Sequence, residues 1–287
     1  MIFVDMDSEL ELEKARNEVL RKIGRNMLLF QQVEQMLKFL ITNGKFSGYI
    51  SEVKANQKQR ATIVHKQTMG QLVGQFLENT HSEGEENTDG PAELKEAYIS
   101  FNFKIESDAV YYETKKQALA AIVAERNELI HHLLPSFNLR TINNCFEADQ
   151  YLDQQREKLL PEMDMLKSMI NSLQEGQKEI AEFLSSEEGK KQFNLTWLRQ
   201  SRLVLLLGDI ATQMARPDGW TMLNTAGQLI RQHAPEEIAI LSKRYGHRTL
   251  KGLILATEIF DIYEEPTDRG GIRVLYRLKP GWELETA

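Results

Sequence analysis

The chain has 287 residues, of which 41% are hydrophobic, so it can bury the cores of about two domains. Its formal net charge of −7 argues against a protein that coats nucleic acid through a global positive field. The one cysteine, Cys145, excludes an intrachain disulfide and favours the cytoplasm. The lack of a long apolar run predicts a soluble protein without a membrane span. The lack of a Cys/His cluster predicts no metal, and we expect no cofactor.

Two amphipathic helices are expected in the first part of the chain. The first covers about residues 8–43 and is ended by Asn43-Gly44, and the second covers about 66–79. A charged run with Gly and Pro, His81 to Pro91, then predicts a loop. After it, apolar and polar side chains alternate, which predicts a short strand within an inserted segment at about 80–106; the apolar positions are Ile99, Phe101, Phe103 and Ile105.

A helix expected at about 112–134, ending before Pro135, carries the most informative polar residues, Arg126, Asn127 and His131. At about 100° per residue, Asn127 and His131 lie roughly 40° apart on the helical wheel, in a strip of small residues that includes Ala120 and Ala124. Arg126 falls beside the apolar stripe of the same helix, so we expect its guanidinium at the edge of the core face.

These residue types can cleave a phosphodiester without a metal. An imidazole accepts or donates a proton near neutral pH, a guanidinium neutralises a scissile phosphate, and an amide can orient either partner. His132 lies away from Asn127 on the wheel and is the second choice for the acid or base. The alternative is a structural role, because an Arg and a His at this spacing recur by chance about once in a few chains of this length.

A further helix is expected from about Pro161, where proline is tolerated at a helix start. Its apolar residues follow a coiled-coil spacing: Leu159, Met163, Leu166, Ile170, Leu173, Ile180 and Leu184. Two interpretations remain open, the closing helix of a bundle and a dimer stalk. The polar run Ser-Ser-Glu-Glu-Gly-Lys-Lys after it predicts a linker at 186–200.

The last part of the chain predicts a small winged domain at 201–280. Two short helices, marked by Met222 to Ile230 and Leu250 to Leu255, precede two strands, about 260–264 and 272–278, that a Gly-Gly turn joins into a hairpin. A basic cluster precedes and enters the last helix, where a helix N-terminus also attracts phosphate; its candidate nucleic-acid ligands are Lys243, Arg244, Tyr245, His247, Arg248 and Lys251. Arg273 and Arg277 on the second strand rank second, because they could pair with Glu264 and Glu265. A solvated loop with an ordinary share of Lys and Arg is the alternative.

Around Arg126-Asn127-x3-His131 the chain resembles the HEPN family of all-helical domains, whose motif is R-x4-6-H. Residues 24–41 and 66–77 look like its first two helices, so the resemblance covers roughly residues 8–185. It implies a metal-independent endoribonuclease that forms a 2′,3′-cyclic phosphate and acts as a homodimer through the helical domain.

The segments 219–233, 243–255 and 260–278, in that order, resemble an OST-HTH/LOTUS domain, which implies RNA binding and, in some animal members, contact with a protein partner. The expected fold is therefore mainly α, a HEPN-like helical bundle followed by a small winged helix-turn-helix domain. The expected function is a ribonuclease whose LOTUS domain captures RNA. The alternative is a non-catalytic RNA-binding or adaptor protein that dimerises through the helical domain.

Overall fold

The computed structural model describes residues 6–81, 94, 96–268 and 270–282. The described chain is mainly helical with a small sheet near its C-terminal end, which confirms the expected fold class. It divides into two compact units. The helical unit contains residues 1–47, 52–87 and 100–178, and the C-terminal unit contains residues 48–51, 88–99 and 179–287.

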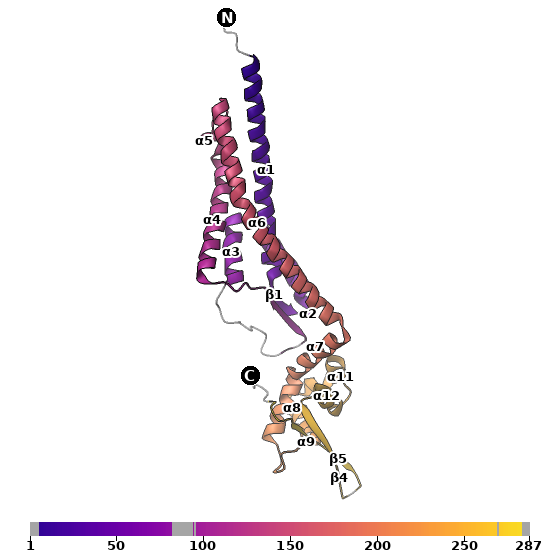
Figure 1. The fold of residues 1–287 in the computed structure, drawn as a ribbon. Helices are drawn as coiled ribbons and strands as arrows, with labels where there is room; N and C mark the ends of the chain where they lie inside the picture. Colours follow the sequence, from indigo (N-terminus) through magenta and orange to yellow (C-terminus); the bar gives the residue numbers. More distant parts are fainter. Residues whose placement is uncertain (1–5, 82–93, 95, 269, 283–287) are drawn as a thin grey trace. The chain divides into compact units, whose positions relative to one another are not determined.

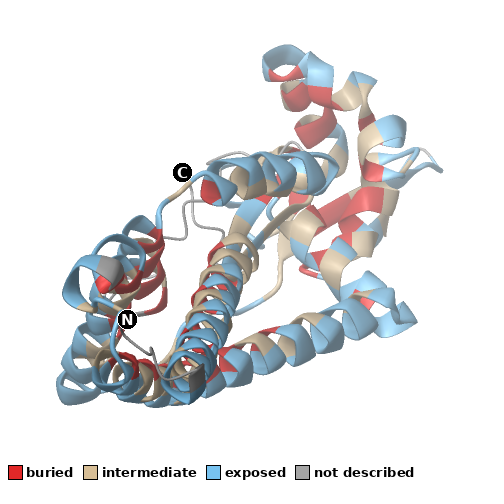
Figure 2. Cartoon of the chain, turned by 90° about the horizontal axis from the view of Figure 1, so that it is seen from above, coloured by how far each residue is buried: buried red, intermediate tan, exposed pale blue. Residues whose placement is uncertain are grey.

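Long amphipathic helices form the helical unit. Helices α1 (Met6–Gly44), α3 (Met69–His81), α4 (Ala109–His131) and α6 (Ile142–Ser185) run alongside one another (Figure 1), with α3 packed against α1 and α4. Figure 2 shows their buried faces turned inward and their exposed faces outward. The buried apolar positions recur at helical spacing, as in α1, where they are Val19, Phe30, Val33, Leu37, Leu40 and Ile41.

Shorter elements join these helices. The chain forms β1 (Lys45–Tyr49) and α2 (Ile50–His65) after α1, and the expected strand is β2 (Tyr98–Asn102), which pairs with β1. Sequence patterns did not indicate β1 or α2. Helix α2 buries only Val64 among its described residues, so it lacks the apolar periodicity that marks the other helices. Residues 82–93, most of the expected loop, lie outside the described residues.

The helix boundaries near the Arg-Asn-His motif are set by local chemistry. Helix α4 begins before its expected start because the Asp108 side chain accepts a hydrogen bond from the Tyr111 amide at 2.7 Å and caps it. It ends at His131, and the short α5 (Leu133–Ser136) follows it and contains Pro135. His131 is thus the last residue of α4, and His132 is its C-cap.

A second expectation, a helix that starts near Pro161, is wrong. Helix α6 begins at Ile142 and continues through Pro161. Leu152 and Leu159 before the proline and Met163 and Leu166 after it are all buried in the same core, and this packing holds the helix together despite the missing amide donor. The seam residues from 159 to 173 close the bundle, whereas Ile180 is exposed.

A polar layer crosses the helical unit. The buried Asn26 amide donates to the Leu152 carbonyl at 2.7 Å and to Gln155 Oε1 at 3.0 Å, and Gln155 Nε2 donates to the Glu125 carbonyl at 3.1 Å. The layer links α1, α6 and α4. Its hydrogen bonds satisfy buried polar groups, which are costly unless they are hydrogen-bonded. Close by, Lys22 Nζ binds Asp153 at 2.6 Å.

In the C-terminal unit, the expected linker at 186–200 is instead mostly helix α7 (Glu187–Arg199). Leu195 and Leu198 of α7 are buried, and Arg199 Nε donates to the Thr257 carbonyl at 2.9 Å. Gly189, which favoured a linker in the sequence, serves a tight corner, because a Cβ there would lie 1.8 Å from the Phe183 carbonyl oxygen. The unit therefore starts well before residue 201.

The rest of the C-terminal unit is a small α+β fold. Helices α8 (Arg202–Gln213), α9 (Leu223–His233), α10 (Pro235–Ala239), α11 (Leu241–Tyr245) and α12 (Leu250–Thr257) accompany strands β3 (Thr221–Met222), β4 (Phe260–Pro266) and β5 (Ile272–Leu278). The antiparallel sheet has the order β3-β5-β4, so the expected hairpin is present. Tyr276 of β5 is fully buried and donates from its hydroxyl to the Leu207 carbonyl at 2.9 Å.

Candidate nucleic-acid interface

A groove of about 690 Å³ opens between α9, the α11–α12 segment and the β4–β5 hairpin. Four cationic side chains line this hairpin groove: Arg231, Arg248, Lys251 and Arg273. Polar side chains that can bond to phosphate or sugar line it as well, namely Asn224, Ser242, Thr249 and Thr267. No Asp or Glu belongs to the described lining. The groove is therefore locally basic, although the chain as a whole is acidic.

Local structure fixes where these cations stand. Arg231 lies in the last turn of α9, and Lys251 lies in the first turn of α12. Thr249 caps α12 by accepting a hydrogen bond from the Gly252 amide at 3.0 Å, and Arg248 directly precedes this cap. The groove is thus lined at one side by a helix N-terminus, whose unpaired amides and partial positive charge favour an anion.

The four cations differ in how free they are. Lys251 forms an ion pair with Glu264 on β4, and Arg273 forms one with Glu265 at 2.9 Å. Arg231 and Arg248 are exposed and have no ion pair within the described part of the chain. They can meet a phosphate without breaking an existing pair, whereas Lys251 and Arg273 must exchange a carboxylate for it.

Tyr245, a predicted RNA ligand, lies in the core of the C-terminal unit. Only 4% of it is exposed, and its hydroxyl donates to Glu237. Burial and then Glu237 raise the pKa of this phenol far above its ordinary value. Its ring stacks on Trp197 with centroids 5.7 Å apart, so it has no open face for a nucleobase in the groove. We therefore leave it out of the interface.

The remaining predicted ligands are divided among different surfaces. Lys243 and Arg244 lie on α11 but line a separate hollow, and Arg244 is bonded to Glu237 at 3.3 Å. His247 is half-buried and does not line the hairpin groove. Arg277 pairs with Asp261 at 3.2 Å and lies 4.5 Å from the centre of the Trp220 ring, outside the groove. The pairing expected for Arg273 is found with Glu265, whereas Arg277 pairs with Asp261 rather than with Glu264 or Glu265.

Sequence reasoning missed Arg231. It stands seventeen positions before Arg248 in the chain, and only the packing of α9 beside α12 brings both to one groove. The available signal was a basic residue in the last turn of an amphipathic helix, where it also suits the helix dipole.

In the helical unit, the Arg-Asn-His motif lies at the surface. Arg126 is half-buried, and its Nη1 donates to Asn127 Oδ1 at 3.3 Å. Asn127 and His131 are exposed on α4 together with Ala120 and Ala124, which matches the expected strip. Among the described residues, the His131 ring lies against the His132 ring, at 6.2 Å between ring centroids.

The neighbouring Glu125 holds this part of α4 in place. Its carboxylate accepts hydrogen bonds from Tyr151 at 3.2 Å, Gln155 at 3.1 Å and Lys158 at 2.5 Å, all on α6. Burial raises the pKa of Glu125, but the bonds from Lys158 and Gln155 outweigh it and leave the pKa lowered. Because Glu125 faces α6, the next two side chains point in other directions, and of these Asn127 is exposed whereas Arg126 is half-buried.

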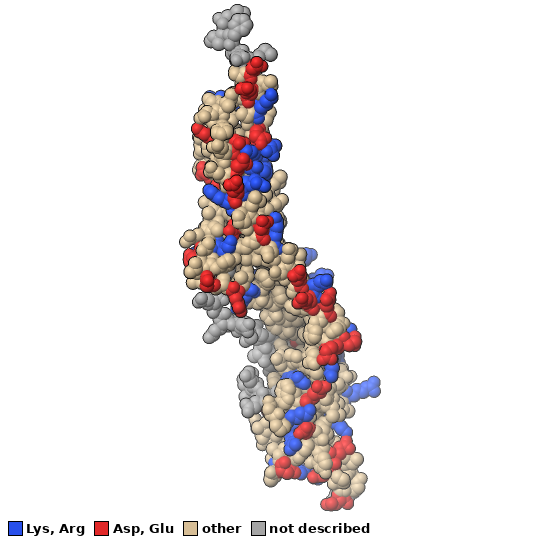
Figure 3. Space-filling view, in the orientation of Figure 1, with Lys and Arg blue, Asp and Glu red and all other residues tan. Residues whose placement is uncertain are grey.

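Charged side chains of both signs are interspersed on one face of the helical unit. On the face shown in Figure 3, acidic and basic side chains alternate along the helical unit rather than gathering into a basic surface.

No three His, Cys, Asp or Glu side chains of the described residues are arranged to hold a metal ion. Nor does any helix in the described ranges combine the length and apolar character that crossing a membrane requires.

Comparison with protein families identifies an OST-HTH/LOTUS domain at residues 171–272. The match begins within α6, includes α7 and most residues that line the hairpin groove, and ends at the start of β5, one position before Arg273. It therefore confirms the LOTUS resemblance and excludes the residues of the Arg-Asn-His motif from the matched range. No curated protein and no solved structure matches the chain.

Proposed function

We propose that the C-terminal unit binds RNA in the hairpin groove. The observation that carries this proposal is the convergence of four cations on a groove with no carboxylate in its described lining, in a domain of the OST-HTH/LOTUS family. Phosphate contacts from Arg and Lys supply most of the affinity of such interfaces and fix the strand in place.

The four cations of the groove would contact phosphate in two different ways. Arg231 and Arg248 meet phosphates directly, since neither has an ion pair among the described residues. Lys251 and Arg273 are held at the rim by Glu264 and Glu265 until RNA displaces these carboxylates. The hydroxyl and amide groups of the groove can reach ribose 2′-hydroxyls, which distinguish RNA from DNA.

A fragment that starts at α7 tests where RNA binds. Residues 186–287 should bind single-stranded RNA. Replacing the four groove cations by Glu should abolish this binding at low salt. Lys190→Glu with Lys191→Glu is the matched control, because both residues are exposed on α7 outside the groove. If the folded fragment does not bind while the full chain does, the groove is not the RNA site. A protein-binding role for the domain would then be favoured.

A second proposal concerns the helical unit, which we propose to be a metal-independent endoribonuclease. The observation that favours it is the exposure of Asn127 and His131 on one strip of α4, with Arg126 bonded to Asn127. His131 would remove the proton of a ribose 2′-hydroxyl or supply one to the leaving 5′-oxygen. Arg126 would neutralise the charge that grows on the phosphate.

One chain supplies a single His131, whereas cleavage requires both a base and an acid. A homodimer that brings two α4 strips together would supply the second imidazole. The exposure of Ala120 and Ala124 supports this, because small residues allow two helices to approach closely. In the alternative, an adaptor protein, the same strip serves dimerisation alone.

The decisive experiment is incubation of the purified chain with total RNA in EDTA, followed by analysis of the new RNA ends. The proposal expects 2′,3′-cyclic phosphates that the His131→Ala variant does not produce. Equal cleavage by repurified wild type and His131→Ala would assign the activity to a contaminant. No cleavage by either, from protein shown to be dimeric and folded, would leave the adaptor role.

A further inference from the structure

Helix α2 carries a basic side that neither the hairpin groove nor the Arg-Asn-His motif includes. Asp and Glu make up 42 of the 287 residues of the chain, yet none lies between Glu52 and Glu78. The basic residues of this acid-free stretch are Lys54, Lys58, Arg60, His65 and Lys66. The stretch therefore differs from the face in Figure 3, where charges of both signs alternate.

The packing of α2 determines which of its sides faces solvent. Val64 is buried in the core of the helical unit. Gln57 Nε2 donates to Asn43 Oδ1 of α1 at 2.9 Å, and Arg60 donates to the Lys45 carbonyl of β1. Val64, Gln57 and Arg60 share one side of α2, so another side is left to solvent.

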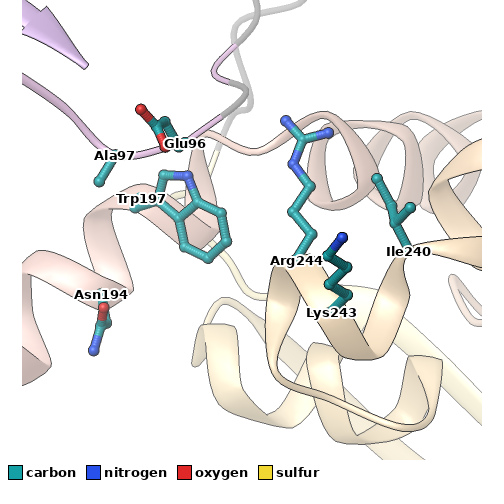
Figure 4. Close-up of a pocket in the computed structure, with 7 residues that line it drawn as sticks. All are labelled: Glu96, Ala97, Asn194, Trp197, Ile240, Lys243 and Arg244. Atoms are coloured by element: carbon teal, nitrogen blue, oxygen red, sulfur yellow. The ribbon is translucent and has the colours of Figure 1, made fainter. Parts of the chain in front are cut away.

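The solvent side bears a row of cations that we call the lysine stripe, made of Lys54, Lys58, His65 and Lys66. At about 100° per residue, the first three fall within about 40° of one another, and Lys66 directly follows the helix. All four residues are exposed, and none of the three lysines has an ion pair within the described part of the chain. By contrast, Lys243 of the C-terminal unit shares a hollow with the carboxylate of Glu96 (Figure 4). The lysines of the stripe can thus meet an anion without exchanging a partner.

The surroundings of the lysine stripe suit a sugar–phosphate backbone. Its neighbours on the helix are small or polar, namely Ala55, Gln59, Ala61 and Thr62. No aromatic residue belongs to α2, whereas the energetic centre of a protein interface is usually a cluster that contains Trp or Tyr. From Lys54 to His65 the stripe extends for about 17 Å, which is long enough to span several phosphates of one strand.

The lysine stripe ends near the helix that carries the Arg-Asn-His motif. Lys66 lies just before α3, which begins at Met69. The start of α3 packs closely on α4, because a Cβ on Gly70 would lie 3.8 Å from Val123 Cγ1. Val123 is adjacent to Ala124, which belongs to the same strip of α4 as Asn127 and His131. The end of the stripe is therefore close to the middle of α4.

We propose that the lysine stripe binds the phosphate backbone of single-stranded RNA and is a second RNA contact, separate from the hairpin groove. The choice of RNA over an acidic protein rests on the proposed RNA binding of the C-terminal unit, whereas the cationic character of the stripe does not. The stripe then holds a strand on the helical unit, whose α4 carries the Arg-Asn-His motif.

Fluorescence anisotropy of the full chain with a labelled single-stranded RNA tests the proposal. A His131→Ala background and EDTA prevent cleavage during the titration. The triple variant Lys54→Gln, Lys58→Gln, Lys66→Gln should reduce the slope of log K against log salt concentration by about 2.1, because each phosphate contact with a single strand contributes about 0.7. Between about 50 and about 200 mM salt, the loss of affinity should become about 18-fold smaller than in the parent chain.

The matched control removes three other exposed lysines of the same unit, through Lys14→Gln on α1 and Lys167→Gln with Lys178→Gln on α6. It should leave the slope unchanged. Thermal unfolding should show both triple variants folded, because Gln is a good helix former. A slope unchanged by the stripe substitutions would overturn the proposal, and so would equal decreases in the stripe and control variants.

Ultraviolet crosslinking followed by mass spectrometry locates the contact. Crosslinks from RNA to peptides of α2 are expected in the parent chain and should be lost in the stripe variant. Arg231→Gln with Arg248→Gln should weaken binding at the groove and leave the α2 crosslinks in place, so the groove and the stripe can fail independently. Crosslinks confined to the C-terminal unit would refute the stripe and leave the proposed RNA binding intact. If the stripe binds polyglutamate but gives no α2 crosslink to RNA, its partner is an acidic protein and the proposal is wrong.

Discussion

Neutralising Arg231 and Arg248 should change the salt dependence of RNA binding in a calculable way. Each phosphate contact with a single strand contributes about 0.7 to the slope of log K against log salt concentration, because condensed counterions are released. Four groove cations therefore give a slope of about −2.8, and the double Gln variant should give about −1.4. Between about 50 and about 200 mM salt, the loss of affinity should fall from about 50-fold to about 7-fold.

The two arginines are the informative pair, because their charges are free among the described residues while Lys251 and Arg273 are held by carboxylates. Fluorescence anisotropy with a labelled single-stranded RNA at four or five salt concentrations measures the slope. Lys190→Gln with Lys191→Gln removes the same charge from α7 and should leave the slope unchanged. Equal slopes for the wild type and the Arg231/Arg248 variant would refute the assignment of the groove, and equal decreases in both variants would indicate a nonspecific charge effect.

Three further predictions concern catalysis, acid stability and the core. His131→Ala should lower RNA cleavage about 10²- to 10⁴-fold, while His132→Ala, the matched control, should retain most activity; the reverse order in a gel assay would move the acid or base to His132. Hydrogen bonds from Lys22 and from Arg25 lower the pKa of Asp153 below its ordinary 3.8. The contribution of Asp153 to stability is therefore present above about pH 4, and it is lost as the pH falls through the lowered pKa of the folded state. Urea unfolding of Asp153→Asn should therefore depend less on pH between about 5 and 2 than wild type, and identical pH profiles would contradict this. Tyr276→Phe removes the buried hydroxyl that donates to the Leu207 carbonyl and should lower the free energy of unfolding by about 1–3 kcal/mol. Tyr263 is half-exposed, and Tyr263→Phe should lower it by less than about 0.5 kcal/mol. Equal costs would show that the Tyr276 hydrogen bond has no role in stability.

Local patterns in the sequence were sufficient for several elements of this chain. The apolar periodicity of α1, the alternation that marks β2, and the Gly-containing turn between β4 and β5 are each encoded within a few residues. The strip that contains Asn127 and His131 is also encoded locally, since residues four positions apart on one helix share a face whatever surrounds the helix. The LOTUS resemblance also rests on ordered local segments, and the family match confirms it.

Tertiary packing decided what local patterns could not. The sequence places Tyr245 among cations, but the five-residue helix α11 turns its ring into the core beside Trp197, because a short helix is oriented by its contacts rather than by its own periodicity. Pro161 and the run at 186–200 have the local chemistry of a helix start and a linker, yet burial of apolar residues on both sides outweighs it. The hairpin groove itself joins Arg231, Arg248 and Arg273 from three separate elements, and the convergence of their charges exists only once α9, α12 and β5 have packed together.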